Sequence, residues 1–332
     1  MVPILAGKEV LLIPTTRFNE TVVVTGVSSF IGMHLACFLT DYFQRVVGTC
    51  GRELNQYDQL RTERLNQAIR RGVKLTSLDL THPVEIDQFI SAERPNIWIQ
   101  HAGHAKDYTS PDYDMNLGHQ VNVAPLGFIY SKLREVGCRG IIITGSCMEY
   151  SDTTDACRED DACLPSTAYG LSKLTETIRS CQLSMQYQIK SRIVRVFIPY
   201  GKWDASGKLI NEVVSSLLQN KPIELSSCIQ KRDFIHIDDL VRGYLACIED
   251  LNRNSLYEIY NLCSGEATTV KEMLLNIAQV LEADPSLLQF GKRALRTGES
   301  LACYGSNIKA STYLNWKPQT RKEALRHFLK DS

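Results

Sequence analysis

The stretch that decides the fold is Thr21-Val-Val-Val-Thr25-Gly26-Val-Ser-Ser-Phe-Ile-Gly32. Its first five residues are β-branched without interruption, which is typical of a strand buried on both faces of a sheet. A glycine follows directly, and from Ile31 to Phe43 the apolar residues recur at helical spacing. A strand, a tight turn and a helix in this order form the opening unit of a parallel sheet.

The same alternation continues along the chain. Apolar runs and helical spacing predict strands at 45–50, 73–78, 96–100, 140–144 and 192–197, and helices at 58–71, 83–92, 118–136 and 169–188. Repeated strand-helix units produce parallel strands with right-handed crossovers and helices on both faces. The predicted fold class is therefore α/β, a doubly wound parallel sheet of the Rossmann type, joined to a smaller mixed α/β lobe.

The turn from Gly26 to Gly32 indicates what the sheet binds. One glycine allows the tight turn and the other allows close packing, while the helix N-terminus presents N–H groups and positive dipole to a pyrophosphate. We therefore predict a dinucleotide cradle. Ligands of such sheets bind outside the carboxyl ends of the strands, so the segments that follow the strands should converge on one crevice.

The length of 332 residues suits two domains, or one domain with a large attached lobe. After residue 165 the regular alternation changes, and short mixed elements follow to the end of the chain. We expect three parts: an N-terminal extension over 1–20, a dinucleotide-binding domain over 21–197 with a return near 232–263, and a substrate-binding lobe over 198–332.

Charge and hydropathy argue against two classes of binding partner, nucleic acids and membranes. The chain has 37 Lys and Arg against 37 Asp and Glu, so its formal net charge is zero. Without a basic excess there is no general attraction to polyanions, so we expect no nucleic-acid partner. The apolar N-terminus is interrupted by Lys8 and Glu9, and no run reaches membrane-spanning length. We expect no membrane partner.

The 11 cysteines are the unusual feature of the composition. Their number is odd and no C-x-x-C pair occurs, which argues against a disulfide framework and a zinc site. We expect reduced thiols in a cytoplasmic protein, most of them packed as small apolar side chains. Only Cys50 and Cys147, at predicted strand ends, lie where a thiol could take part in function.

A second motif carries acid-base chemistry. Tyr169-Gly-Leu-Ser-Lys173 places a hydroxyl and an ammonium on one helix face, since positions four apart are neighbours on a helix. A nearby ammonium lowers the pKa of a tyrosine toward the range useful for proton transfer. Ser146, at the end of the fifth strand, is placed to hydrogen-bond the same substrate oxygen.

These motifs, with Ser146-Cys-Met-Glu-Tyr150 and Lys231-Arg-Asp-Phe-Ile-His-Ile-Asp-Asp239, resemble the extended short-chain dehydrogenase/reductases, the nucleotide-sugar epimerase/dehydratase family. The resemblance extends from Thr21 to Pro318. It implies that Tyr169 is the acid/base, that Lys173 holds the nicotinamide ribose, and that Ser146 orients the sugar carbonyl. It also implies a nucleotide-diphosphate sugar as partner, bound mainly by the lobe, and a homodimer.

Site residues follow from the resemblance and from residue chemistry. The expected cofactor-binding residues are Gly26, Ser28, Ser29, Phe30, Ile31, Gly32, Arg52, Asp79, Leu80, Ala102, Gly103, Tyr169 and Lys173. The expected substrate-binding residues are Lys106, Ser146, Cys147, Arg232 and Arg296. The family pattern is broken at Ser29, which replaces the middle glycine, and at Ile198, which replaces a frequent asparagine. We expect no metal, because His101, His104 and His119 offer no fixed ligand face.

The strand-end residues separate the possible cofactors and reactions. An NAD enzyme usually offers a carboxylate to the ribose after the second strand, whereas this chain has Arg52, so NADP(H) is favoured and NAD is possible. The 4,6-dehydratases of this family resemble one another in carrying acidic residues one or two places after the catalytic Ser or Thr. In this chain those two places hold Cys147 and Met148. Glu149 falls one residue later, and a shift of one residue in an extended segment turns a side chain to the opposite face. We favour a 4-ketoreductase of a nucleotide-linked (deoxy)hexose, with a C4-epimerase as the alternative. A dehydratase and a non-catalytic cofactor-sensing protein are less favoured.

Overall fold

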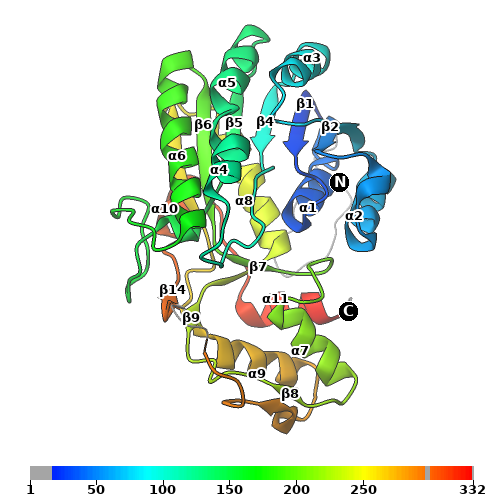
Figure 1. Cartoon of the computed structure of the whole chain (residues 1–332), viewed down its shortest axis with the longest axis vertical. Helices are drawn as coiled ribbons and strands as arrows, with labels where there is room; N and C mark the ends of the chain where they lie inside the picture. Colours follow the sequence, from blue (N-terminus) through cyan, green and yellow to red (C-terminus); the bar gives the residue numbers. More distant parts are fainter. Residues whose placement is uncertain (1–16, 296–299, 331–332) are drawn as a thin grey trace.

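The computed structural model describes residues 17–295 and 300–330. An upper domain holds a central sheet between two layers of helices, and a smaller lobe lies below it (Figure 1). The carboxyl ends of the strands point toward the lobe, so the segments that follow the strands lie between the two parts.

In the described part of the chain, seven parallel strands form the main sheet in the order β11-β6-β5-β4-β1-β2-β3. The strands are β1 (Phe18–Thr25), β2 (Phe43–Cys50), β3 (Lys74–Ser77), β4 (Ile97–Gln100), β5 (Gly140–Ser146), β6 (Lys190–Val196) and β11 (Tyr257–Leu262). The strand order reverses between β1 and β4, which is where ligands of doubly wound sheets bind. The predicted fold class is confirmed.

The two faces of the sheet bury alternate residues of each strand. Val22 and Val24 pack with one helical layer, whereas Val23 packs with the other. The first layer contains α1 (Phe30–Leu39), α2 (Gln59–Arg70) and α8 (Ile237–Asp250), and the second contains α3 (Pro83–Glu93), α5 (Leu126–Glu135) and α6 (Ala168–Tyr187). Burial on both faces explains why the strands read as continuous apolar runs.

The single helix predicted over 118–136 is wrong in one respect. The chain forms α4 (Met115–Gly118), a π-helical turn, η2 (His119–Val123), and then α5. Pro125 has no N–H and cannot donate to the preceding turn. The N–H of Ala124 instead bonds the carbonyl of His119, a wider spacing that accommodates the proline.

The lobe is built from short elements around its own core. Its strands are β7 (Ile198–Tyr200), β8 (Ile223–Glu224), β9 (Lys231–Arg232), β10 (Phe234–His236), β12 (Thr268–Thr269), β13 (Leu288–Gln289) and β14 (Ala302–Cys303). Its helices are α7 (Leu209–Leu218), α9 (Val270–Val280) and α11 (Arg321–Lys330), with the 3-10 turn η4 (Pro285–Leu287). Helix α10 (Ile308–Tyr313) packs instead against β11 of the main sheet, and the 3-10 turns η1 (Leu54–Gln56) and η3 (Cys147–Glu149) follow β2 and β5. Helices α7, α9 and α11 pack together, while α8 and β11 return the chain to the main sheet. None of the helices in the described ranges is long and apolar enough to span a membrane.

Candidate active site

The glycine turn after β1 is held tightly against the end of β4. Gly26 adopts a φ of +76°, and a Cβ there would lie 2.9 Å from the Cα of Ala102. A Cβ on Gly32 would lie 2.4 Å from the carbonyl oxygen of Gly26, so α1 begins directly on the turn. The hydroxyl of Thr25 accepts hydrogen bonds from the N–H groups of His101 and Ala102. These contacts fix both sides of the reversal in strand order.

Ser29, which departs from the glycine pattern, has a role in the turn. Its Oγ accepts the N–H of Gly32 at 3.0 Å as the N-cap of α1, and lies 2.8 Å from Nε2 of His101. The other ring nitrogen of His101 lies 3.1 Å from the hydroxyl of Thr144. Burial lowers the pKa of His101 to about 4, so the ring is neutral at physiological pH. The serine side chain is thus directed into a neutral hydrogen-bond network.

The cradle fits a dinucleotide. The turn from Ser28 to Gly32 leads into the N-terminus of α1, whose first N–H groups have no partner within the helix and carry positive partial charge. Of the other predicted cofactor residues, Arg52 is exposed just after β2, Asp79 follows β3 and accepts hydrogen bonds from Thr81, and Leu80 is buried in the sheet core. Phe30 and Ile31 lie in the segment that follows β1, and Gly103 lies in the segment that follows β4.

The structure brings the predicted catalytic residues to one place. Ser146 ends β5, and Tyr169 and Lys173 lie in the first two turns of α6. A Cβ on Gly170 would lie 2.1 Å from the carbonyl oxygen of Met148, so α6 begins in contact with the turn that follows Ser146. The Ser146 hydroxyl accepts the N–H of Met148 at 3.1 Å, which leaves its own proton for another acceptor.

Burial controls the protonation state of Tyr169. Removal from water raises the pKa of Tyr169 to about 12, against the charge of Lys173, which lowers it. Tyr169 therefore carries its proton at neutral pH. The Lys173 ammonium is buried and forms an ion pair with Glu176 one turn further along α6. Burial raises the pKa of Glu176 to about 7, although the Lys173 charge acts in the opposite direction.

Two further tyrosines surround Tyr169 and were not singled out from the sequence. The rings of Tyr108 and Tyr113 each lie 5.6 Å from the Tyr169 ring in edge-on orientation. Tyr108 also accepts a hydrogen bond from Lys208 of the lobe, at 3.1 Å. Both tyrosines lie in the loop after β4. The only feature of the sequence that could have indicated them is that this loop is rich in aromatic residues.

Glu149 faces the interior rather than the crevice. One carboxylate oxygen accepts the N–H of Ser146 at 2.8 Å, and the other accepts from Thr177 at 2.9 Å and from Nε of Arg195 at 3.0 Å. Both charged side chains of this pair are almost fully buried. Glu149 is therefore held by Arg195 and fastens the turn after Ser146 to β6.

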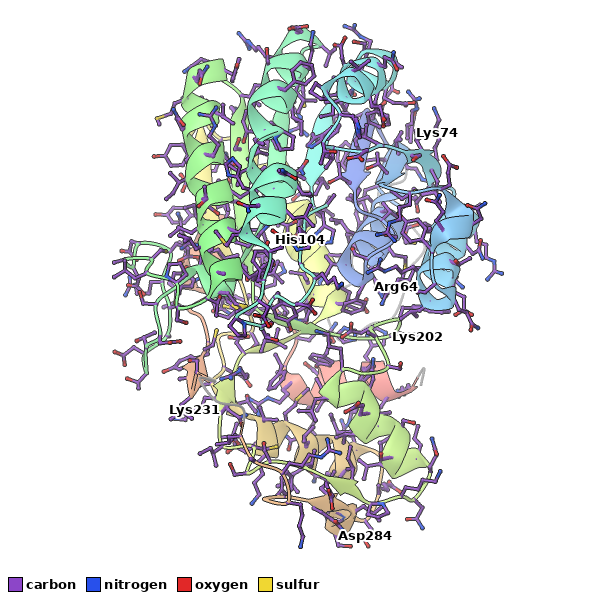
Figure 2. The ribbon with its side chains drawn as sticks, in the orientation of Figure 1. Arg64, Lys74, His104, Lys202, Lys231 and Asp284 are labelled. Carbon is purple, nitrogen blue, oxygen red and sulfur yellow. The ribbon has the colours of Figure 1, made fainter. Side chains whose placement is uncertain are left out.

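The predicted substrate residues come from both parts of the molecule. Lys106 lies exposed in the loop after β4, and Cys147 is buried beside Ser146. Arg232 lies on β9 of the lobe, where it donates to the carbonyl of Ser300 at 2.8 Å. Arg296 lies outside the described residues. Figure 2 shows His104 and Arg64 at the lower end of the sheet domain and Lys231 across from them in the lobe.

Arg64 was also missed from the sequence. It is a buried residue of α2, and its guanidinium donates to the carbonyl of Ser28 at 3.3 Å and to that of Trp203 at 2.7 and 2.9 Å. It therefore ties the glycine turn to the first loop of the lobe. Its donors are directed at carbonyl groups, so we assign it a structural role.

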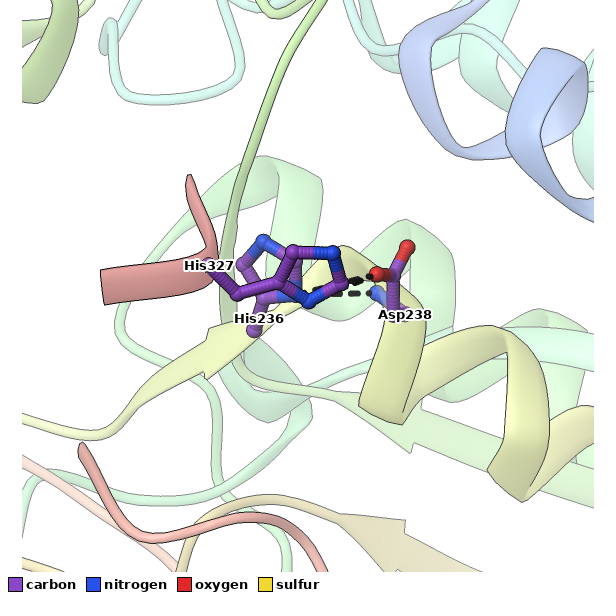
Figure 3. Close-up of side chains that lie close together, drawn as sticks. All are labelled: His236, Asp238 and His327. Carbon is purple, nitrogen blue, oxygen red and sulfur yellow. Dashed lines mark hydrogen bonds and ion pairs between the residues drawn. The ribbon is translucent and has the colours of Figure 1, made fainter. Parts of the chain in front are cut away.

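Two histidines and an aspartate meet where the C-terminal helix joins the domain (Figure 3). The side chain of Asp238 lies 3.7 Å from Nδ1 of His236 and 3.4 Å from Nδ1 of His327. Burial lowers the pKa of His236 to about 4, so its neutral ring accepts the N–H of Asp238 and caps α8. Since that lone pair is already engaged, we interpret the group as a fastening between α8 and α11 rather than a metal site.

Comparison with known proteins places the chain among dinucleotide-dependent enzymes. A family model described as "NAD dependent epimerase/dehydratase family" matches residues 22–263. A dTDP-4-dehydro-6-deoxyglucose reductase from Escherichia coli is 33% identical over 156 residues, which cover 45% of this chain and 48% of the reductase. This match therefore spans about half of the reductase.

Longer matches are with epimerases. A UDP-glucuronate 4-epimerase from Thermodesulfobacterium geofontis is 26% identical over 314 residues, covering 89% of this chain and 90% of that protein. Among solved structures, a UDP-glucuronic acid 4-epimerase from Bacillus cereus, in complex with UDP-glucuronic acid and NAD, has a TM-score of 0.80 at 20% identity, covering 94% of this chain and 99% of that one. The structural match shows the fold.

Proposed function

This chain belongs to the NAD dependent epimerase/dehydratase family, and we propose that its reaction is the NADP(H)-dependent reduction of a 4-keto sugar carried on a nucleoside diphosphate. The observation that carries this proposal is the placement of Tyr169 and Lys173 on α6 where that helix meets the turn after Ser146, while Glu149 of that turn is engaged by Arg195. Tyr169 holds its proton at neutral pH, as the proton donor of a ketone reduction must. The 33% identity to a 4-dehydro-6-deoxyglucose reductase supports the same direction.

The protein groups divide the proton chemistry. When bound, the nicotinamide cofactor supplies the hydride. The Ser146 hydroxyl would donate a hydrogen bond to the C4 oxygen of the sugar, and Tyr169 would transfer its proton to that oxygen. The Lys173 ammonium would stabilise the tyrosinate that remains and would bind the nicotinamide ribose. The surrounding rings of Tyr108 and Tyr113 would exclude water from the transfer.

The positions after Ser146 offer no suitable acid for the elimination of water from the sugar. Cys147 and Met148 occupy the next two positions, and Glu149 is engaged by Arg195 and Thr177. A dehydratase would need a free carboxyl group at this point to protonate the leaving hydroxyl group. The side chains after Ser146 therefore support hydride chemistry without elimination.

A preference for NADP(H) is part of the proposal. Arg52 is exposed at the carboxyl end of β2, the position from which a side chain reaches the adenosine ribose. A guanidinium there would pair with a 2′-phosphate, whereas NAD needs an acceptor for its 2′-hydroxyl. A cytoplasmic location belongs to the same proposal, because eleven free thiols suit a reducing compartment.

The two parts of the molecule would share the ligands. We assign the cofactor to the domain over 21–197 with its return near 232–263, and the nucleotide sugar to the lobe over 198–332. Arg232 supports this division, because it lies on the lobe next to the crevice and a guanidinium suits a diphosphate. Arg296 is assigned the same ligand on its chemistry alone.

A homodimer would cover the outer face of α6, which we define as Leu171, Ile178 and Met185. These side chains are seven residues apart and are 48%, 60% and 49% exposed. An apolar stripe of this kind is typical of an interface. A hollow of about 430 Å³ lies beside it, lined by residues of η2 and α6 that include His119 and Ile178. A second copy of the chain, packing the same helix against it, is the occupant we propose.

The alternative reaction is C4 epimerisation, which the match to UDP-glucuronate 4-epimerase over 89% of this chain favours. The two reactions differ in cofactor balance. The purified protein would be mixed with NADPH and a dTDP-4-keto-6-deoxyhexose, and absorbance of the reduced cofactor would be followed alongside product formation. Loss of one NADPH per product, slower with NADH, supports the reductase. Epimerised nucleotide sugar formed from a 4-hydroxy substrate without net consumption of cofactor would overturn it.

A further inference from the structure

Five of the eleven cysteines, all of them among the described residues, gather in one cluster beside the catalytic loop. The cluster contains Cys147, Cys157, Cys163, Cys263 and Cys303, packed around Tyr150 and Phe197. Cys147 follows Ser146 directly in η3, and Cys303 lies on β14 of the lobe. The cluster therefore joins the catalytic loop to the lobe that we assign to the substrate.

The thiols of Cys147 and Cys303 are in contact across this junction. Both belong to the same packed cluster, and each thiol affects the pKa of the other. Cys147 is only 7% exposed, whereas Cys303 is half-buried. A small oxidant can therefore reach Cys303 more readily than Cys147.

The surroundings of Cys303 favour its thiolate. Arg232 lies directly opposite Cys303 in the parallel pairing of β9 with β14. The neighbouring Cys147 thiol lowers the pKa of Cys303 against the effect of burial, and the charge of Arg232 acts in the same direction. The other four thiols of the cluster have raised pKa values. Since the thiolate is the reactive form, the half-exposed position of Cys303 opposite Arg232 favours its reaction with an oxidant.

We propose that Cys303 and Cys147 are an oxidation-sensitive thiol pair, which a hydroperoxide converts to a disulfide between the lobe and the catalytic loop. A half-exposed reactive thiolate beside a second thiol is the arrangement that oxidation-sensing proteins use. The sequence offered no sign of it, because the two cysteines lie far apart in the chain and meet only when the lobe folds back.

The chemistry balances with hydrogen peroxide as oxidant. The Cys303 thiolate attacks one peroxide oxygen, so an S–O bond forms, the O–O bond breaks and hydroxide leaves. The Cys147 sulfur then attacks the Cys303 sulfenic acid, forming the S–S bond while the S–O bond breaks. The thiol proton of Cys147 leaves with the hydroxyl group as water. The two sulfurs together lose two electrons, and the two peroxide oxygens gain them.

The disulfide would restrain the site. It would tie the residue after Ser146 to the strand that pairs with Arg232, so the lobe could no longer adjust around a substrate. Loss of turnover rests on the proposed function, whereas formation of the disulfide does not. The two parts of the proposal therefore fail separately.

The test uses the full-length protein treated with hydrogen peroxide. Digestion without reductant and mass spectrometry should find a peptide that joins Cys147 to Cys303, reversed by dithiothreitol, while NADPH-dependent turnover falls in step. Cys303→Ser should slow inactivation about tenfold or more. Cys163→Ser removes a half-buried thiol of the same cluster and should leave wild-type sensitivity.

Two results would overturn the thiol pair: no cross-link between the two cysteines, with Cys303 passing to sulfinic acid alone, or inactivation of Cys303→Ser at the wild-type rate. The peptide measurement on wild-type protein needs no variant, so it holds even where a substitution prevents folding. A cross-link in a protein without reductase turnover would sustain the pair and defeat only the proposed reaction.

Discussion

Helix α6 presents two faces of opposite character. Toward the sheet it buries polar side chains, among them Lys173, Glu176 and Thr177, whereas its outer face exposes three large apolar side chains. The inner face contacts the polar network at the carboxyl ends of the strands, which includes His101 and the Glu149–Arg195 pair. We call this set of buried polar groups the site network.

The contrast shows where function is placed on this fold. Burying polar or charged groups is costly unless each has a partner, so the site network persists because its members satisfy one another. Exposing large apolar groups is unfavourable unless a partner covers them. In our proposals the same helix therefore serves chemistry on one side and assembly on the other.

The largest effect on activity is expected when the Tyr169 hydroxyl is removed from the inner face of α6. Tyr169→Phe should lower kcat about 10³-fold, because the sugar oxygen loses its proton donor, with little change in cofactor affinity. Tyr187→Phe, at the other end of the same helix, is the matched control and should retain wild-type turnover. Undiminished turnover of Tyr169→Phe in steady-state assays would mean that the chain is not an enzyme of the proposed kind.

Removing one charge from the site network should affect folding next most strongly. Glu149→Gln leaves the Arg195 guanidinium buried without its carboxylate, so the free energy of unfolding should fall by about 3 kcal/mol or more. Denaturant unfolding measures this change. Asp160→Asn removes one member of an exposed pair with Arg158 and should change stability by less than about 0.5 kcal/mol. Equal effects of the two substitutions would contradict the assigned burial.

The neutral ring of His101 predicts a pH dependence of stability. Its pKa is about 4 in the folded chain and 6.5 ordinarily, so the unfolded chain binds more protons between these values. Above pH 6.5 the ring is neutral in both the folded and the unfolded chain, so the stability is at its full value. As the pH falls from 6.5 toward 4, the unfolded chain binds a proton that the folded chain does not, and the free energy of unfolding decreases. The loss should be roughly 2 kcal/mol for a ring that keeps some exposure.

His101→Gln should reduce that pH dependence in thermal unfolding scans. Some dependence should remain in His101→Gln, because burial also lowers the pKa of His236. A wild-type protein as stable at pH 4.5 as at pH 7 would show that the ring is not held neutral.

Substitutions on the outer face of α6 should have the smallest effect on stability and turnover. Ile178→Lys should leave turnover and monomer stability nearly unchanged, but should shift the molecular mass in sedimentation from dimer to monomer. Leu218→Lys on α7 replaces another large apolar side chain, 59% exposed, and should not alter the mass. A wild-type protein that sediments as a monomer would remove the assembly half of the contrast.

Much of the fold could be predicted because buried parallel strands have a local signature. The β-branched run at Thr21–Thr25 and the apolar run that begins β5 both lie where the strands form. The π-helical turn before Pro125 could not be predicted, because it depends on which carbonyl each N–H reaches after the proline has removed one donor.

The site was predictable where spacing on one helix places side chains together, as for Tyr169 and Lys173. It was not predictable where distant segments meet. Ser29 looked like a weakened glycine position until its contact with His101 was seen, and Glu149 could be placed only once the turn after Ser146 was seen to direct it toward Arg195. Cys303 had no local signal at all.

The most direct test of the central claim follows the hydride itself. The protein would be given NADPH deuterated at the transferable position together with a nucleotide-linked 4-keto-6-deoxyhexose, and the product would be analysed by mass spectrometry and NMR. The reductase predicts one deuterium at C4 of every product molecule, with matching loss of NADPH. Product that carries no deuterium at C4 would contradict it.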